Sequence, residues 1–468
     1  MTAGRFCGGP VDGESTSTSR VARCVSALQA PAVPSWRGVG ESARARDDEQ
    51  VGSLAAAVLP LIRTRADLHR WGSARQHGMV MHEAVDLLEQ AMPTGEPVEV
   101  HAVTHKALTS AIKVIARADD SSGVIGDACR RLLALHPRTA AAASTPPGRL
   151  VDWMIAFQFD GDVDYFELDP VAYAPALGAD GITAYRHRLG EIQVRVGDPP
   201  ADRLASSHRH EHWVLSWNEQ RLAVLDRDAD AVIRTHARDR RIARWFYDTA
   251  AALVEIDRVD LATDWARQGA GIDPFHQAQE CADLWVSLLD RQPQYDADDV
   301  LAARRSVFDR WPTDSTAARL HDAATAAGRA WADIDEDVIN RLAQQPRNAV
   351  CFALGTLRDP RRAWQLAHDL DLDPDDTHTW GSLVTAYEAI DPPATFPVHA
   401  RIVERDLTHA DARRYRDAAR RLAGMRTLAA GTGDQEHIDH VDQLIADLRL
   451  THRRRPRLQQ EFDRADVP

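Results

Sequence analysis

Apolar residues recur along most of this chain at every third or fourth position, and short polar stretches rich in proline or glycine separate the runs. That spacing places the apolar side chains on one face of a helix, whereas a half-buried strand would alternate them. The only weak strand candidate is Glu191–Val196. Because the helical pattern begins near Gly52 and continues to Leu458, the sequence predicts an all-α protein.

In the first part of the chain, apolar stripes predict helices over Leu54–Arg65, from Asp67 to Ala91, and over His101–Ala118, Ile125–His136, Leu150–Phe159 and Val171–Arg188. Pro137 is expected to end the fourth of these, because an interior proline removes one hydrogen bond and clashes with the preceding turn. The last is expected to be two short helices around Pro175. Side-chain oxygens of the turn Ser121-Ser122-Gly123 are expected to cap the helix beginning near Val124.

The best-defined pattern is Arg241–Pro274, which predicts two helices joined by a tight turn. Large and small residues fall at the offsets of a tetratricopeptide-type hairpin, namely Phe246, Ala250, Leu253, Ala262, Gly269 and the helix stop Pro274. Thr249 and Ala266 depart from that pattern, in which bulkier apolar residues are usual. Such a hairpin buries its apolar face by stacking on neighbours, and the stack usually forms a surface for partners.

Two partial copies of this hairpin follow. One begins at Trp380 and loses its register at Pro392-Pro393, and the other runs from Tyr415 through Gly431–Gly433 to Leu448. One good match and two partial ones predict an irregular α-solenoid of tetratricopeptide-like helical hairpins. The alternative is a large irregular helical bundle in which small residues only permit close packing.

Composition divides the chain into three predicted parts. Residues 1–50 are rich in Gly, Ser, Thr, Arg and Pro without periodicity, so we expect a disordered tail, and the sequence leaves open whether it belongs to the native protein. Gly197–Pro200 is the clearest internal boundary. It gives an N-terminal helical domain over 51–198 and a C-terminal helical-repeat domain over 199–468.

Two stretches resemble known families. The stretch from about 59 to 189 resembles an uncharacterised bacterial family through Asp119–Gly123, Leu135-His136 and Leu177–Gly181. From about 230 to the end, the chain is similar to the helical region that follows a SWIM-type zinc finger, through Trp265-Ala266, Ala363-Trp364, Tyr415–Leu422 and His452–Arg455. The resemblance implies a helical-repeat fold and no established activity. The finger's C-x-C and C-x-H spacings do not occur in this chain, so the resemblance implies no zinc.

The net charge, the length of the apolar runs and the cysteines exclude some classes of partner and favour one location. The net charge of −14 argues against a chain that coats a phosphate backbone along its whole length. The apolar runs are shorter than the roughly 20 residues of a membrane span. The N-terminus also lacks a signal-peptide pattern, so we expect no association with a membrane. The five cysteines are odd in number and widely spaced, which favours a reducing cytoplasm.

His208, His210 and His212 form the densest set of possible metal ligands. On an extended segment alternating histidines would point to one side, as a Zn²⁺ site requires. On a helix His208 and His212 share a face and His210 points elsewhere. No cysteine or carboxylate at firm metal spacing completes a ligand set, so we expect a solvated helix start before Trp213.

The basic segment Arg449–Arg457 opposes the net charge and forms part of a predicted C-terminal helix. It could contact phosphates of a nucleic acid. The alternative is a solvated helix whose arginines pair with acidic residues nearby, such as Asp434, Glu436 and Asp439.

No nucleophile elbow, phosphate loop or dinucleotide fingerprint occurs in the sequence, so we name no catalytic, cofactor-binding or metal residue. We expect a non-enzymatic, cytoplasmic scaffold for protein–protein interaction, without a cofactor. Two rival hypotheses are a nucleic-acid-associated accessory protein that uses the basic C-terminal helix and a metal-dependent hydrolase at His208–His212. The identity of the partner and the oligomeric state do not follow from the sequence.

Overall fold

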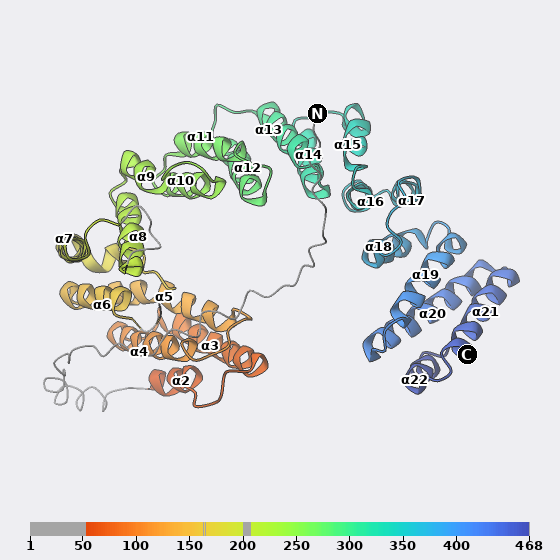
Figure 1. Cartoon of the computed structure of the whole chain (residues 1–468), viewed down its shortest axis with the longest axis horizontal. Helices are drawn as coiled ribbons and strands as arrows, with labels where there is room; N and C mark the ends of the chain where they lie inside the picture. The colour runs from red at the N-terminus through yellow and green to blue at the C-terminus, as the bar shows by residue number, and fades with distance from the viewer. Residues whose placement is uncertain (1–52, 162, 164, 200–206, 468) are drawn as a thin grey trace, which may run out of the picture. The chain divides into compact units, whose positions relative to one another are not determined.

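A computed structural model shows the chain as a succession of helices (Figure 1). The structure describes residues 53–161, 163, 165–199 and 207–467, so the predicted disordered tail 1–50 lies outside the described residues. Within these ranges there are 21 α-helices, one short 3-10 helix and no strand, which confirms the predicted all-α fold. The strand candidate Glu191–Val196 is wrong, because these residues form the last turns of helix α7 (Pro170–Val196).

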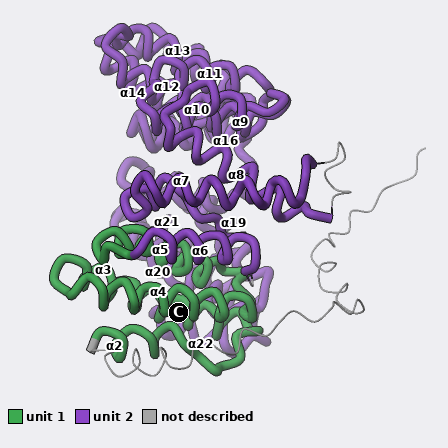
Figure 2. The backbone as a smooth tube through the Cα atoms, turned by 90° about the vertical axis from the view of Figure 1, so that its left-hand side faces the viewer, with its two compact units in different colours: residues 1–145 green, residues 146–468 purple. Residues whose placement is uncertain are grey.

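The first compact unit covers residues 1–145 (Figure 2). Its described part contains α2 (Ser53–Ile62), α3 (Trp71–Ala91), α4 (Pro97–Ile115) and α5 (Val124–Ala142). Helix α5 packs on α3 and α4, and α2 packs on the same two helices. Asp120 caps α5 instead of the predicted serines, since its carboxylate oxygens accept hydrogen bonds from the amides of Ile125 at 3.0 Å and Gly126 at 2.7 Å, whereas the Ser122 hydroxyl has no hydrogen-bond partner among the described residues.

Helix α5 continues through Pro137 to Ala142, so the prediction that this proline ends the helix is wrong. A proline inside a helix costs about 3 kcal/mol relative to alanine. The same helix buries Leu132, Leu135 and Ala140 almost completely, in a unit where α5 packs on α3 and α4. Each buried leucine contributes about 1.5–3 kcal/mol. Burial of the apolar face therefore outweighs the local preference of the proline.

The second compact unit covers residues 146–468 and contains the remaining seventeen α-helices of the described chain. They are α6 (Pro147–Phe159), α7, α8 (Arg209–Leu225), α9 (Ala229–His236), α10 (Ala243–Glu255), α11 (Val259–Ala270), α12 (His276–Leu289), α13 (Ala297–Arg310), α14 (Asp314–Ala326), α15 (Asp335–Leu342), α16 (Pro346–Gly355), α17 (Pro360–Asp369), α18 (Thr377–Tyr387), α19 (Pro392–Leu407), α20 (Ala412–Thr432), α21 (Gln435–Thr451) and α22 (Pro456–Arg464). None of the described helices in either unit is long and apolar enough to cross a membrane.

The core of the second unit is divided into clusters that follow the chain in order. Their buried residues run from Ala223 to Trp311, from Phe308 to Phe352, from Val350 to Ile402 and from Phe396 to Val467. Most helices accordingly pack on helices adjacent in sequence. This nearest-neighbour packing is consistent with the predicted helical array.

The boundary between the two compact units lies at Thr145/Pro146, within the linker of small residues. The internal domain boundary expected from the sequence, at 198/199, stays a prediction. That position lies between α7 and α8, which pack on each other inside the second unit. Helix α7 itself breaks at Gly178, whose φ of 59° is not helical, rather than at Pro175, where the sequence predicted a division. Glycine adopts positive φ without the steric cost that a side chain would add.

The predicted hairpin at Arg241–Pro274 is present as α10 and α11, which pack on each other, and both contact α12. The requirement for a small residue is sharpest at Gly269. A Cβ atom there would lie 2.6 Å from the Cys281 sulfur and 2.6 Å from Phe246 Cβ, closer than real Cβ contacts. Glycine at this position therefore permits the close approach of the three helices.

The two partial copies also correspond to helix pairs. Pro392 stands in the first turn of α19, where a proline is tolerated because its missing N–H has no partner there in any case. The second helix of that pair thus begins at the prolines. In the last copy, Gly433 ends α20 with a φ of 70°, and α21 returns with Val441, Ile445 and Leu448 buried.

Candidate functional site

Helix α8 is held in place by a ring of buried polar side chains from α6, α7 and α8. Gln158 donates from Nε2 to the Tyr185 hydroxyl at 2.7 Å, and this hydroxyl donates to Asn218 Oδ1 at 2.7 Å. Asn218 closes the ring by donating from Nδ2 to Gln158 Oε1 at 3.0 Å. The ring, which we call the Tyr185 ring, satisfies these buried groups and fixes α8 against α6 and α7.

Arg221 anchors the other end of α8. Its guanidinium group donates to both carboxylate oxygens of Asp169, each at 2.9 Å, and to those of Glu255 at 3.0 and 2.7 Å. The side chain is only 11% exposed. Burial alone would lower the pKa of Arg221, but the hydrogen bonds to Glu255 and Asp169 raise it above its usual value. These contacts tie α8 to the start of α7 and the end of α10.

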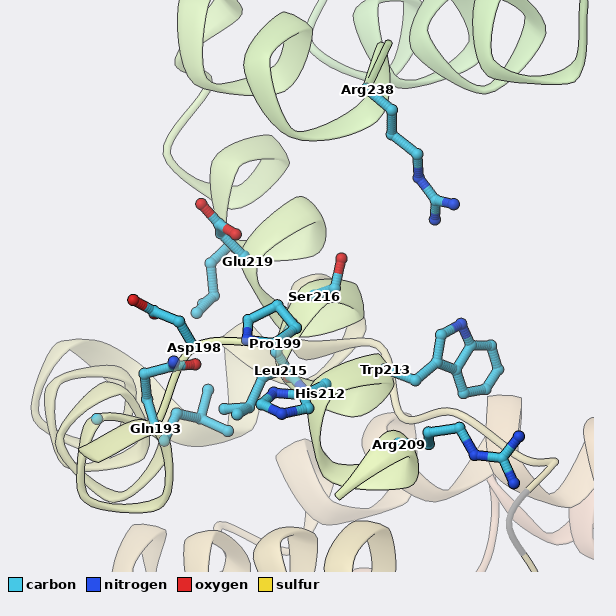
Figure 3. Close-up of a pocket in the computed structure, with 14 residues that line it drawn as sticks. Gln193, Asp198, Pro199, Arg209, His212, Trp213, Leu215, Ser216, Glu219 and Arg238 are labelled. Atoms are coloured by element: carbon cyan, nitrogen blue, oxygen red, sulfur yellow. The ribbon is translucent and has the colours of Figure 1, made fainter. Parts of the chain in front are cut away.

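Helix α8 also lines a cavity of about 800 Å³, the α7–α9 cavity, which Asn218 of the Tyr185 ring borders as well (Figure 3). Helix α7 and the turn after α9 provide the remaining walls. Leu189, Leu215 and Leu222 give the cavity an apolar portion. His212 and Glu219 line it from the same face of α8, because residues at a spacing of three, four or seven share one side of a helix.

The α7–α9 cavity has a side rich in cations and a side with carboxylates. Trp213 is 44% exposed and lies beside Arg209, while Arg238 extends toward them from the turn after α9 (Figure 3). The carboxylates of Asp198 and Glu219 lie on the other side of the same view. A solvent-exposed indole next to two guanidinium groups is suited to contact with an apolar or aromatic group that carries a negative charge nearby.

The turn that carries Arg238 has an unusual backbone. Arg238 has a φ of 47° and Arg240 a φ of 58°, in the left-handed region that residues with side chains rarely adopt. Each such residue costs roughly 1–2 kcal/mol. The Arg238 guanidinium lies 5.5 Å from the centre of the Trp245 ring, and that of Arg240 lies 4.9 Å from the Trp265 ring. Cation–π contacts therefore help to hold this strained turn.

The three histidines considered as possible metal ligands do not converge. Helix α8 begins at Arg209, so the segment is helical. His208 Nδ1 lies 3.1 Å from a carboxylate oxygen of Glu211, and His210 Nε2 lies 2.7 Å from the carbonyl oxygen of Gln158. His212 lines the α7–α9 cavity. In the part of the chain that the structure describes, no group of three or more His, Cys, Asp and Glu residues is arranged to hold a metal ion.

The basic segment Arg449–Arg457 spans the end of α21, a turn and the start of α22, rather than one helix. Arg449 donates to Asp463 at 2.7 Å and to Gln459 at 3.0 Å. Arg457 pairs with Glu461 at 2.8 Å, and Arg455 donates to the carbonyl oxygen of Leu407.

Arg453 and Arg454 are exposed, and neither forms an ion pair with any described residue. The predicted pairing with acidic residues therefore exists for part of the basic segment. Its partners are Asp463 and Glu461 instead of Asp434, Glu436 and Asp439.

A cluster of three histidines lies in the first unit, where sequence reasoning named no site. His105 Nδ1 is 3.0 Å from His136 Nε2, and His101 Nδ1 is 3.1 Å from the Thr139 hydroxyl. Burial, together with His105, lowers the pKa of His101 to about 4. Burial and the two neighbouring histidines lower the pKa of His136 to about 2, and burial also lowers that of His105. We call this set the histidine cluster; its members are neutral at pH 7.

Sequence reasoning also missed the α7–α9 cavity. Nothing in the local sequence distinguishes the exposed Trp213 from the other tryptophans. Arg238 reaches the cavity from a turn 25 residues beyond Trp213, so no spacing pattern connects the two. The signal that was available was the pair Arg209 and Trp213, which an i, i+4 spacing places on one side of a helix.

A family model described as a family of unknown function, DUF6880, matches residues 59–458. No curated protein matches the chain. The match agrees with the expected resemblance to an uncharacterised family and extends it over most of the sequence. It does not bear on the SWIM-type relationship, which stays a prediction.

Proposed function

Since the chain belongs to the DUF6880 family, whose function is unknown, we propose from its structure that it is a non-enzymatic helical scaffold that binds a segment of another protein in the α7–α9 cavity. The observation that supports this is the half-exposed Trp213 beside Arg209 and Arg238, above an apolar lining. We further propose that it acts in the cytoplasm. Its oligomeric state is left open.

The composition of the cavity favours a protein segment as the ligand. Tryptophan and arginine are the residues most enriched among those that dominate binding energy at protein interfaces. Leu189, Leu215 and Leu222 provide apolar area for one side chain of the partner. Charges of both signs at the edge, from Arg209 and Arg238 on one side and Asp198 and Glu219 on the other, would orient the segment.

The anchoring of α8 supports the same proposal. A binding residue contributes most when its own helix does not have to be ordered on binding. The Tyr185 ring and the Arg221 contacts fix α8 against α6, α7 and α10. The rival hypotheses have less support, because Arg449, Arg455 and Arg457 are used in contacts within the chain and the three histidines have separate neighbours.

Affinity capture with the full chain as bait tests this proposal. The bait is the wild type or Trp213→Ala, the captured proteins are identified, and the affinity of the strongest is measured with purified components. Trp213→Ala should weaken that affinity by about 30-fold, which corresponds to the 2 kcal/mol typical of a dominant interface residue. Trp71→Ala is the matched control, because Trp71 is 52% exposed in the first turn of another helix and also lies beside an arginine, Arg75.

The control variant should bind like the wild type, and circular dichroism should show that all three proteins are equally helical. If Trp213→Ala and the wild type bind the purified partner equally, the cavity is not the binding site. If no captured protein binds in purified form, the scaffold function itself is contradicted.

A further inference from the structure

A second hollow, of different chemistry, lies between α20 and α22. These two helices pack through a shared apolar core that includes Tyr415, Leu422 and Phe462. The solvent side of the contact encloses a cavity of about 570 Å³. We call it the arginine pocket, after the four arginines that line it, namely Arg413, Arg416, Arg420 and Arg464.

The arginines of α20 form a row. Arg413, Arg416 and Arg420 are separated by three and four residues, so they lie on one face of the helix while Tyr415 and Leu422 are buried on another. The row is about 10 Å long, at 1.5 Å of rise per residue. The side chains of Arg413 and Arg420 are 86% and 77% exposed, so their guanidinium groups are accessible.

A buried carboxylate positions the arginines of α22. The Glu461 side chain is only 4% exposed, and its Oε1 forms an ion pair with Arg457 at 2.8 Å and accepts a hydrogen bond from Arg464 at 3.0 Å. A carboxylate that is desolvated and shared in this way is costly to displace, so it holds the Arg464 guanidinium group at the edge of the pocket. Arg464 is still 60% exposed and offers further donors to solvent.

The arginine pocket carries an excess of positive charge. Its lining has four guanidinium groups against the two carboxylates of Asp417 and Glu461, in a protein whose net charge is −14. Asp417 is shared by Arg413 and Arg420. Arg416 forms no ion pair with any residue that the structure describes, and donates only to the carbonyl oxygen of Ala412, at 3.4 Å. Like charges held this close favour an anion that neutralises them.

The remaining lining indicates what kind of anion fits. Apart from the charged residues, only Ala419 and Ala465 line the pocket, so it has no apolar recess for a peptide side chain and no aromatic ring on which a base could stack. Guanidinium groups match the geometry and charge of phosphate oxygens. We propose that the arginine pocket binds a small molecule through its phosphate groups, and that Arg413, Arg416, Arg420 and Arg464 supply the contacts.

This site is independent of the α7–α9 cavity, and its test uses isothermal titration of the full chain with inorganic pyrophosphate. The wild type should bind pyrophosphate, and added salt should weaken the binding. The double variant Arg416→Gln, Arg420→Gln should lose at least about tenfold in affinity, because it removes two charge-assisted contacts. Arg454→Gln is the matched control, an exposed arginine on the turn before α22 without an ion pair among the described residues, and should bind like the wild type.

A parallel titration with ADP identifies the source of the phosphate groups. Equal affinities for ADP and pyrophosphate would mean that the phosphates alone are recognised, and tighter ADP binding would mean that the ligand is a nucleotide. The proposal is overturned if neither probe binds the wild type, or if Arg454→Gln loses as much affinity as the double variant. It is also overturned if a thymidine oligonucleotide binds at least about tenfold more tightly than pyrophosphate and depends on the same arginines.

Arg413→Gln provides a second variant in case the double variant is less helical than the wild type. Arg413 is almost fully exposed, so its replacement leaves the core between α20 and α22 intact. It should weaken pyrophosphate binding several-fold, in proportion to the loss of one contact. If the wild type binds pyrophosphate and Arg413→Gln binds it with the same affinity, the arginine row of α20 does not contribute to the site.

Discussion

The two compact units bury their polar side chains in different ways. In the second unit the Tyr185 ring joins a hydroxyl and two amides, and burial raises the pKa of Tyr185 further above the physiological range. In the first unit the histidine cluster joins three imidazoles whose pKa values are lowered by burial. Both sets are hydrogen-bonded and enclosed, but only the histidine cluster has groups that gain a proton, and hence a charge, as the solution becomes acidic.

The difference teaches that two polar clusters, both buried and hydrogen-bonded, can differ in how their stabilising effect depends on pH. The Tyr185 ring stabilises α8 equally at every pH at which proteins are usually handled. The histidine cluster stabilises α4 and α5 only while its members are neutral, since a proton that enters the folded unit must be desolvated. The first unit therefore contains a buried cluster that makes α4 and α5 sensitive to acid.

The largest expected effect is acid destabilisation of the first unit. A histidine with a folded pKa below its unfolded value of 6.5 binds its proton first in the unfolded state. The stability of the unit is thus complete above pH 6.5 and falls as the pH drops from 6.5 toward the folded pKa of about 4 for His101 and about 2 for His136. We expect a loss on the order of 3 kcal/mol between pH 6.5 and pH 4.

Hydrogen exchange in α4 and α5, corrected for intrinsic rates and compared with α6–α8 at each pH, measures this effect. A local measurement is needed because burial and Arg421 also lower the pKa of His399 in the second unit to about 4. His136→Gln is the matched variant and should show a smaller loss in α4 and α5 over the same pH range. If acid increased hydrogen exchange equally in α4–α5 and in α6–α8, the proposed difference between the two polar clusters would be contradicted.

A substitution in the apolar packing of α10, α11 and α12 provides a reference for both polar clusters, because it alters packing and leaves the Tyr185 ring and the histidine cluster unchanged. Gly269→Ala places a Cβ atom against Cys281 and Phe246, where the structure leaves 2.6 Å to each. We expect a loss of about 1–3 kcal/mol in the free energy of unfolding, the usual cost of overpacking. Urea denaturation measures it, and Cys281→Ala in the same chain should restore part of the stability.

The loss from Gly269→Ala should be independent of pH between 5 and 8, as no titrating group is involved. A neutral or stabilising effect of this substitution would show that α10, α11 and α12 can separate slightly without cost. The small-residue requirement of the hairpin would then be weaker than the structure indicates. Gly431→Ala is the control, because a Cβ atom there would meet no neighbour within 4 Å.

The smallest expected effect is that of Tyr185→Phe. It removes one hydroxyl from the ring and leaves the Asn218 oxygen without its donor, which costs about 1–2 kcal/mol. The loss should be the same at pH 5 and pH 8, in contrast to the histidine cluster. Urea denaturation at the two pH values measures it, and a pH-dependent loss would contradict the assignment of the ring as a neutral network.

Much of the fold followed from local patterns. The hairpin of α10 and α11 was predicted from the spacing of large and small residues, because that spacing is the packing requirement itself. Pro137 misled the prediction, since local preference at one residue was weaker than burial of Leu132 and Leu135 against other helices. Gly178 was missed as the break in α7 because a proline nearby offered a stronger local signal.

The candidate sites were less predictable because each joins residues that are distant along the chain. The histidines at 208–212 attracted attention as neighbours in sequence, yet their rings contact different groups. Arg413, Arg416 and Arg420 were visible as a row, but Arg464 lies 44 residues beyond Arg420 and meets them only through the packing of α20 on α22. Periodicity predicts which face of a helix is exposed, but it does not predict which residues from distant parts of the chain lie beside that face.

The hydrogen bonds of the histidine cluster also determine which ring nitrogens carry a hydrogen. The Thr139 hydroxyl donates its single hydrogen to the carbonyl oxygen of His136, so it can only accept from His101, whose Nδ1 must carry the proton. Between His105 Nδ1 and His136 Nε2 one hydrogen serves two nitrogens, so the tautomer of one ring dictates that of the other. In this cluster one ring therefore has a fixed tautomer, and the tautomers of the other two are linked through their shared hydrogen bond.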